Sequence, residues 1–125
     1  MDYIKDAVRT DLQTYEPVLE RLQSKQTARL IHGMVGISTE SGELLDALKK
    51  HLMYGKSLDL VNIKEEVGDV LWYCALILDE VGASFEDVMK TNIDKLRARF
   101  PEKFTEEKAV NRDLDTERKI LEGQH

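Results

Sequence analysis

The stretches GISTESGELL (residues 36–45) and EEVGDVLW (residues 65–72) each place two carboxylates three positions apart. The first pair is Glu40 with Glu43, and the second is Glu66 with Asp69. On an α-helix, side chains three positions apart lie on the same face, one turn from each other. Each stretch therefore predicts a helix that presents two carboxylates in one direction.

Apolar residues around both pairs recur three or four positions apart, which is the period of an amphipathic helix. In residues 30–52 this spacing leaves Glu40 where a hydrophobic residue is expected, and in residues 63–81 Glu66 and Asp69 flank an unbroken apolar ladder. Carboxylates beside buried stripes repel one another and lose hydration unless cations neutralise them. Oxygen ligands without cysteine or histidine at matching spacing favour Mg²⁺ or Mn²⁺. The metal ligands predicted from the sequence are Glu40, Glu43, Glu66 and Asp69.

The chain predicts an all-α fold, a helical bundle of about four to five helices. It contains only two prolines and seven glycines, and no strand-like alternation of useful length. We expect helices over residues 2–15, from Pro17 onward, and over residues 24–54, 59–81 and 84–99, with Ser24 and Ser84 as N-caps and Gly55 and Gly82 as stops. A short connection should make the two long helices antiparallel, so that the two carboxylate pairs face each other.

Residues 1–104 are expected to form one domain, and residues 105–125 a charged C-terminal helix or tail. Val110, Leu114 and Leu121 recur at helical spacing in the tail, but they are too few to build a core alone. We expect the tail to dock on the main body or on a second subunit, with a partly disordered end as the alternative. The apolar content of so few long helices favours burial against a second copy, which predicts a homo-oligomer.

Composition and charge argue against several classes of protein. The formal net charge of −6 at pH 7 is unsuited to a general nucleic-acid-binding protein, which needs a basic face. No stretch approaches the roughly 18 consecutive apolar residues of a membrane span, and the N-terminal residues MDYIKD lack the features of a signal peptide. A cytoplasmic protein without membrane association is expected. The single cysteine, Cys74, lies within the apolar ladder and is interpreted as a small buried hydrophobe.

Three residues of the predicted helix over residues 84–99 suit phosphate oxygens. Asn92, Lys95 and Arg99 lie at positions i, i+3 and i+7, which places them on one helical face. Lysine offers a point charge, arginine a bidentate fork and asparagine a further hydrogen bond. Taken alone, however, the two cations are better explained by their favourable interaction with the helix C-terminus.

The motifs ESGE (residues 40–43), EVGD (residues 66–69) and NIDKLRARFP (residues 92–101) together carry a resemblance, with 22 residues between the first two. The arrangement is similar to the MazG-like branch of the all-α nucleoside triphosphate pyrophosphohydrolases, over about residues 25–104. Many relatives have a glutamate immediately before the first pair, where this chain has Thr39. The absence of this acidic group is expected to affect the number of metals bound or the route of proton transfer.

The resemblance implies hydrolysis of a nucleoside triphosphate between the α- and β-phosphates, with Mg²⁺ held by the four carboxylates, in a homodimer or homotetramer. The residues suit this chemistry, because carboxylate-held divalent ions activate water and neutralise phosphate charge. We expect Glu40 and Glu43 to be catalytic, through one of these carboxylates or through a bound cation that it orients. The expected substrate-binding residues are Asn92, Lys95, Arg99, Lys56, His32 and Trp72.

Several of these residues also have a purely structural interpretation. His32 could line a base pocket or be satisfied within a helix interface, and Trp72 and Tyr73 could stack on a base or pack against another helix or subunit. Lys56, in the predicted connection, is a candidate for the phosphate tail. The three glycines within residues 33–42 indicate either close helix packing or room for a nucleotide.

Three alternatives stay open. A related pyrophosphohydrolase could act on phosphoribosyl-ATP or dUTP, because base and sugar preference depend on pocket shape. A non-catalytic, oligomeric helical interaction module could use the glutamates in structural ion pairs. A carboxylate-bridged di-iron bundle would need Glu-x-x-His pairs on two helices, and Glu122 with His125 is the single such spacing in the chain.

Overall fold

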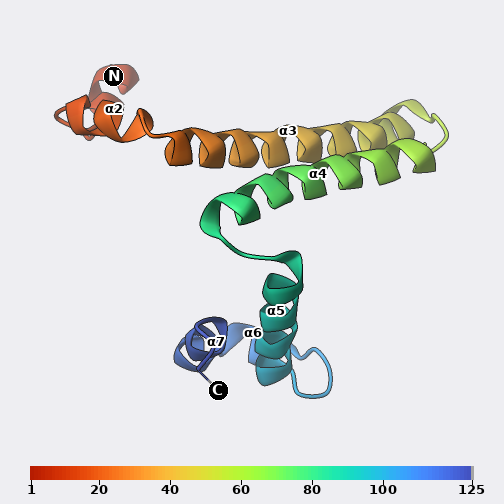
Figure 1. The fold of residues 1–125 in the computed structure, drawn as a ribbon. Coiled ribbons are helices and arrows are strands. Elements are labelled where there is room, and N and C mark those ends of the chain that lie inside the picture. Colours follow the sequence, from red (N-terminus) through yellow and green to blue (C-terminus); the bar gives the residue numbers. More distant parts are fainter. Residues whose placement is uncertain (125) are drawn as a thin grey trace. The chain divides into compact units, whose positions relative to one another are not determined.

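The structure, a computed structural model, describes residues 1–124, and within them every regular element is a helix (Figure 1). The all-α class predicted from the sequence is confirmed. Seven helices are present in the described residues, because the C-terminal segment adds two short ones to the five expected upstream. They are α1 (Tyr3–Val8), α2 (Glu16–Leu22), α3 (Lys25–Tyr54), α4 (Leu60–Val81), α5 (Phe85–Arg99), α6 (Glu106–Val110) and α7 (Leu114–Leu121).

The prediction of one helix over residues 2–15 is wrong, because α1 ends at Val8. Side chains beyond that point bond to the local backbone instead of continuing the helix. The Thr10 hydroxyl donates to the carbonyl of Ala7 at 3.0 Å, and the Asp11 carboxylate accepts from the amide of Leu12 at 2.7 Å. Such side-chain contacts compete with the helical hydrogen-bond ladder, and they explain the early end.

The boundaries of the longer helices follow the predicted caps. The hydroxyls of Ser24 and Ser84 each accept a hydrogen bond from the amide three residues on, at 3.1 Å in both cases. Gly55 and Gly82 follow α3 and α4 with φ angles of 65° and 69°, a left-handed conformation that glycine adopts without steric cost. Asp59 caps α4 through two hydrogen bonds from the amides of residues 61 and 62.

Helices α3 and α4 run side by side in opposite directions (Figure 1). Arg29 near the start of α3 donates to Glu80 near the end of α4, at 2.5 Å. Further along α3, Gly36 lies so close to the ring of Tyr73 that a Cβ atom would overlap it, and Gly33 meets Ile77 in the same way. The missing side chains therefore let the two helices approach closely, which favours the packing interpretation of these two glycines.

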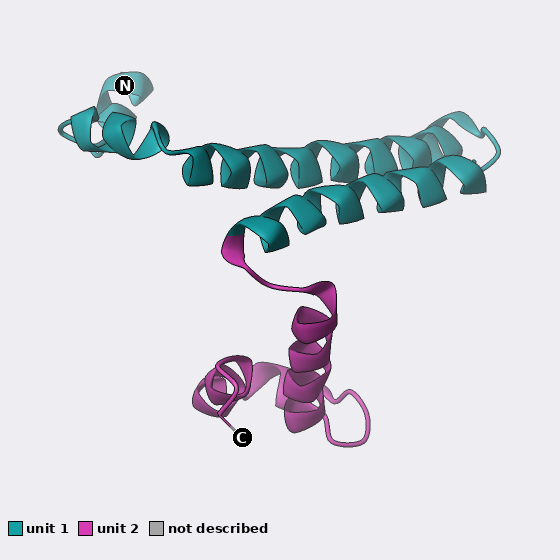
Figure 2. Cartoon of the chain, viewed as in Figure 1, with its two compact units in different colours: residues 1–80 teal, residues 81–125 magenta. Residues whose placement is uncertain are grey.

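The chain divides into two compact units, residues 1–80 and residues 81–125 (Figure 2). The first unit contains α1 to α3 and nearly all of α4. In the second unit α7 packs against α5. The carboxylate of Glu117 on α7 accepts two hydrogen bonds from Arg99 on α5, at 2.6 and 2.7 Å, and two from Arg112, at 2.6 and 3.4 Å. Within residues 81–124, the C-terminal segment thus docks on α5 through this buried carboxylate.

The apolar stripes predicted as a core are not enclosed by one copy of the chain. Among the described residues no hydrophobic side chain is fully buried, and Cys74, predicted to be buried, is only half-buried. Large side chains on α3 and α4 stay exposed, including Met34, Leu45 and Leu71. Within residues 1–124 these stripes are therefore only partly covered, and the enclosed core predicted from the sequence is not present. None of the helices within residues 1–124 combines the length and the apolar character that spanning a membrane requires.

Candidate active site

Carboxylates from both long helices meet near the middle of α3 and α4, where the two helices lie side by side. Glu40 on α3 and Glu66 and Asp69 on α4 each offer an oxygen, and these oxygens all lie within 4.8 Å of one another. The three-residue spacing puts Glu66 and Asp69 on one face of α4, and the antiparallel packing of the helices brings Glu40 opposite them. The structure thus brings together three of the four residues predicted as metal ligands.

The cluster is partly withdrawn from water and holds excess negative charge. Glu66 is only 8% exposed, Glu40 is half-buried and Asp69 is exposed. A hydrogen bond with Glu66 raises the pKa of Glu40, and burial and repulsion by Glu66, Asp69 and Glu43 raise it further. Two carboxyl groups can share a hydrogen bond only if one of them keeps a proton, so their approach favours the protonated form. The same crowding of negative charge favours a cation at this position.

The donor set fits a hard divalent cation. Carboxylate oxygens are the ligands that Mg²⁺ and Mn²⁺ prefer, and three of them converge here from two helices. Among residues 1–124, no other group of three or more acidic, histidine or cysteine side chains comes together in this way. The di-iron alternative required Glu122 and His125, and His125 lies outside the described residues.

One neighbour of the cluster was missed by the sequence analysis. The side-chain amide of Asn62 donates to Oε1 of Glu66 at 2.9 Å, and both residues lie on α4. The signal was present in the sequence, since Asn62 precedes Glu66 by four positions and therefore lies above it on the same helical face.

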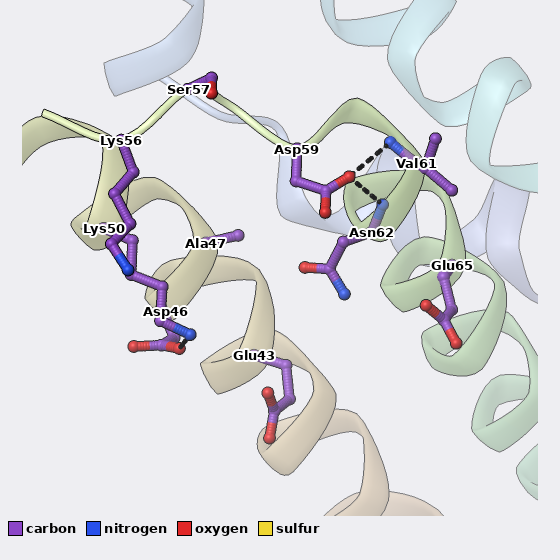
Figure 3. A pocket seen from close by; sticks show the side chains of 10 residues that line it. All are labelled: Glu43, Asp46, Ala47, Lys50, Lys56, Ser57, Asp59, Val61, Asn62 and Glu65. Carbon is purple, nitrogen blue, oxygen red and sulfur yellow. Dashed lines mark hydrogen bonds and ion pairs between the residues drawn. The ribbon is translucent and has the colours of Figure 1, made fainter.

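Glu43, the fourth predicted ligand, lies one turn closer to the connection between α3 and α4. It is exposed and borders a hollow of about 470 Å³ beside this connection (Figure 3). The hollow also has two lysines in its lining, Lys50 and Lys56. Lys50 forms an ion pair with Asp46 at 2.6 Å. Cations and carboxylates therefore line a single hollow that Glu43 shares.

Aromatic residues lie on the other side of the cluster. Trp72 and Tyr73 line a second hollow, of about 360 Å³, together with Glu40 and Asp69. The ring of His32 on α3 lies 6.2 Å from the ring of Trp72 and 5.7 Å from that of Tyr73, in edge-to-face geometry. Trp72 remains 58% exposed. Acidic and aromatic groups thus share one open hollow.

A comparison with known protein families identifies the family of this chain. The family profile of the MazG nucleotide pyrophosphohydrolase domain matches residues 15–104. The chain belongs to the MazG nucleotide pyrophosphohydrolase family. The resemblance inferred from the sequence motifs is therefore confirmed, and the family membership indicates a nucleotide pyrophosphohydrolase in general terms. No curated protein and no solved structure matches the chain.

The match to the MazG domain covers α2 to α5, and with them all three members of the acidic cluster. MazG proteins generally use divalent metals, in agreement with this cluster. Thr39 directly precedes Glu40, and its hydroxyl donates to the carbonyl of Gly36 at 2.9 Å. Its side chain is therefore engaged with its own helix.

Three predicted phosphate-binding residues of the MazG domain belong to the second compact unit. Asn92 is exposed and Lys95 is half-buried on α5. Arg99 directs Nε and Nη2 to the carboxylate of Glu117, which raises the pKa of the arginine still further. One complete edge of the Arg99 guanidinium is thus already occupied by an anion of the same chain.

Proposed function

We propose that this chain hydrolyses a (deoxy)nucleoside triphosphate between the α- and β-phosphates, with Mg²⁺, and releases the monophosphate and pyrophosphate. The observation that carries the proposal is the convergence of Glu40, Glu66 and Asp69 within 4.8 Å. Family membership supports the general activity, and the oxygen-only donor set supports a hard divalent ion. Mn²⁺ has the same preference for oxygen and could replace Mg²⁺.

Glu40, Glu66 and Asp69 would hold the cation, and Glu43 would extend the ligand set towards the hollow beside the connection. When bound, the metal neutralises charge on the phosphates and makes water a better nucleophile. The protein supplies a fixed arrangement of carboxylates on two packed helices, so little reorganisation is needed when substrate arrives. A solvated surface cluster would lack this preorganisation.

The reaction needs a base for the attacking water. An oxygen–phosphorus bond forms between water and the α-phosphate, the bond from that phosphorus to the bridging oxygen breaks, and pyrophosphate departs with the bonding electrons. Glu40 and Glu43 are the proposed catalytic residues, and a carboxylate oxygen of one of them accepts the proton released by water. Glu40 is the better placed, because it already belongs to the convergent group.

Substrate recognition is proposed from the groups around the cluster. His32 and Trp72 offer aromatic surface for stacking on the base, since Trp72 is exposed and shares a hollow with Glu40 and Asp69. Lys56 borders the neighbouring hollow and would bind the phosphate tail. Asn92, Lys95 and Arg99 keep their proposed role in binding phosphate or sugar, which for Arg99 requires exchange of Glu117 for the substrate anion.

We further propose that the active form is a homodimer or homotetramer. The described chain buries none of its large hydrophobic side chains fully, and exposed apolar residues follow both α3 and α4. A stable protein needs to remove such surface from water, and a second copy offers a matching apolar stripe. Light scattering at several protein concentrations would test this assembly.

The decisive test is a panel of ribonucleoside and deoxyribonucleoside triphosphates, with dUTP and phosphoribosyl-ATP included, incubated with Mg²⁺, with Mn²⁺ or with a chelator. We expect the monophosphate and pyrophosphate, and no turnover in the chelator. Release of orthophosphate would show cleavage at another bond and would overturn the mechanism. Absence of turnover across the panel, together with no effect of metal on thermal stability, would favour the helical interaction module.

A further inference from the structure

The side chain of Asn62 makes one directed contact, and this contact is with the most buried member of the acidic cluster. Its Nδ2 donates to Oε1 of Glu66 at 2.9 Å, and Glu66 is only 8% exposed. Asn62 itself is half-buried, one helical turn before Glu66. We propose that Asn62 is a positioning residue, which fixes the Glu66 carboxylate in the orientation that binds the shared divalent cation. The inference rests on the proposed function and deepens it.

The Asn62 amide is not needed for the cap of α4. The start of this helix is stabilised by Asp59, whose Oδ1 accepts from the backbone amides of Val61 and Asn62. The Asn62 side chain is therefore not engaged in capping, and it bonds to the carboxylate one turn further along. Replacement of the side chain should leave the helix start intact, so a metal-binding defect can be measured in a folded protein.

The chemistry of the donor also fits a positioning role. A neutral amide restricts rotation of the carboxylate while leaving its negative charge uncompensated, so the charge remains available for a cation. An arginine or lysine at the same place would also orient the carboxylate, but it would compete with the metal for that charge. Hydrogen bonds to metal-binding side chains typically contribute about 10–100-fold in metal affinity.

The test measures Mn²⁺ binding by electron paramagnetic resonance, which reports free Mn²⁺ and needs no catalytic turnover. We expect Asn62→Ala to raise the Kd for Mn²⁺ by about 10-fold or more. Asn62→Gln keeps an amide donor at the same helical spacing and should bind Mn²⁺ more tightly than Asn62→Ala. Ser41→Ala is a matched control beside Glu40, because the Ser41 hydroxyl donates to the carbonyl of Ile37 at 2.6 Å. It should bind Mn²⁺ like the wild type.

The outcomes separate this inference from the proposed function. Mn²⁺ binding by the wild type with an unchanged Kd in Asn62→Ala would overturn the positioning role alone. Equal weakening in Asn62→Ala and Asn62→Gln would also overturn it, because the donor would then be irrelevant. Absence of Mn²⁺ binding by the wild type would overturn the proposed metal site itself, and the inference with it. Circular dichroism of each variant confirms that the helices are intact.

Discussion

Glu66 in the first compact unit and Glu117 in the second are the two buried charged residues among those described, at 8% and 5% exposure. Their surroundings are opposite. Glu117 accepts hydrogen bonds from Arg99 and Arg112. Glu66 lies beside the carboxylates of Glu40 and Asp69 and accepts from the neutral amide of Asn62. One buried carboxylate is neutralised by its own chain, and the other is set among further negative charge.

The two environments shift pKa values in opposite directions. Hydrogen bonds from Arg99, and then from Arg112, lower the pKa of Glu117 from 4.5 to about 2. In the other cluster, the contact with Glu66 raises the pKa of Glu40. A structural ion pair is complete without further ligands, whereas an uncompensated acidic cluster costs free energy until a cation arrives. The comparison separates a carboxylate that is paired within the fold from carboxylates that we propose bind a metal.

Replacement of Glu66 should give the largest effect, and it should be on catalysis. Because loss of a hydrogen bond to a metal ligand already costs about 10–100-fold, Glu66→Gln should lower kcat/KM by at least about 100-fold. Glu65→Gln is the matched control, since Glu65 is exposed and lies outside the group of three. Steady-state hydrolysis in saturating Mg²⁺ measures both. An equal loss of kcat/KM in Glu66→Gln and Glu65→Gln would contradict a specific role for Glu66 in the site.

Replacement of Glu117 should instead act on stability. Glu117→Gln leaves two arginines without their shared anion, and we expect the midpoint of thermal unfolding to fall by several degrees. The backbone amides of α7 should also exchange hydrogen faster in Glu117→Gln than in the wild type. Glu122→Gln is the control, because the Arg118–Glu122 pair is exposed and should contribute little. If Glu122→Gln were as destabilising as Glu117→Gln, burial would not be what distinguishes this ion pair.

The pH dependence should follow from the same contact. Since the folded pKa of Glu117 is about 2 and its ordinary value is 4.5, its contribution is fully present above pH 4.5 and is lost as the pH falls towards about 2. Protection of α7 against hydrogen exchange should therefore weaken across this interval. In Glu117→Gln the weakening should be smaller, and an identical acid profile in both proteins would contradict the assignment.

The close approach of α3 and α4 predicts an opposite response at two glycines of the same helix. A Cβ at residue 36 would overlap the ring of Tyr73, so Gly36→Ala should cost about 1–3 kcal/mol in the free energy of unfolding. At Gly42 nothing lies within 4 Å of the added atom, and Gly42→Ala should stabilise the protein by roughly 0.5–1 kcal/mol. Denaturant unfolding of both variants measures the difference. Stabilisation by Gly36→Ala would show that Tyr73 does not pack there.

The smallest effect should come from removal of one charge in the metal-free cluster. Because neighbouring carboxylates raise the pKa of Glu40, its ionised form is disfavoured in the folded state, and metal-free stability should rise as the pH falls through that raised pKa. Glu40→Gln should accordingly raise the thermal midpoint slightly in a chelator. It should also reduce the stabilisation that Mg²⁺ gives the wild type. The interaction-module alternative predicts no such metal-dependent difference.

Much of the fold could be predicted because its signals are local. Ser24, Ser84, Gly55 and Gly82 set helix ends through contacts within a few residues, and each was identified from sequence. The spacing of the acidic pairs fixed a shared helical face, and the short connection predicted antiparallel helices. The end of α1 was missed, because side-chain competition at Thr10 and Asp11 leaves no periodic signal.

Other features depend on contacts that spacing alone does not reveal. Arg99 and Glu117 form an ion pair although they are 18 positions apart, and the sequence around either residue does not predict this contact. From the sequence, Arg99 was therefore interpreted only as a phosphate-binding residue or as a cation near the helix C-terminus. The apolar stripes were predicted from their spacing, but spacing does not reveal how far one chain encloses them. Asn62 was readable in principle, since its amide precedes Glu66 by one helical turn.

The most direct test of the central claim is anomalous X-ray diffraction from crystals grown with Mn²⁺. The account predicts an anomalous peak between Glu40, Glu66 and Asp69, with carboxylate oxygens of both helices about 2.0–2.3 Å from it. A fully occupied Mn²⁺ elsewhere, with these three side chains paired to lysines or arginines, would contradict it.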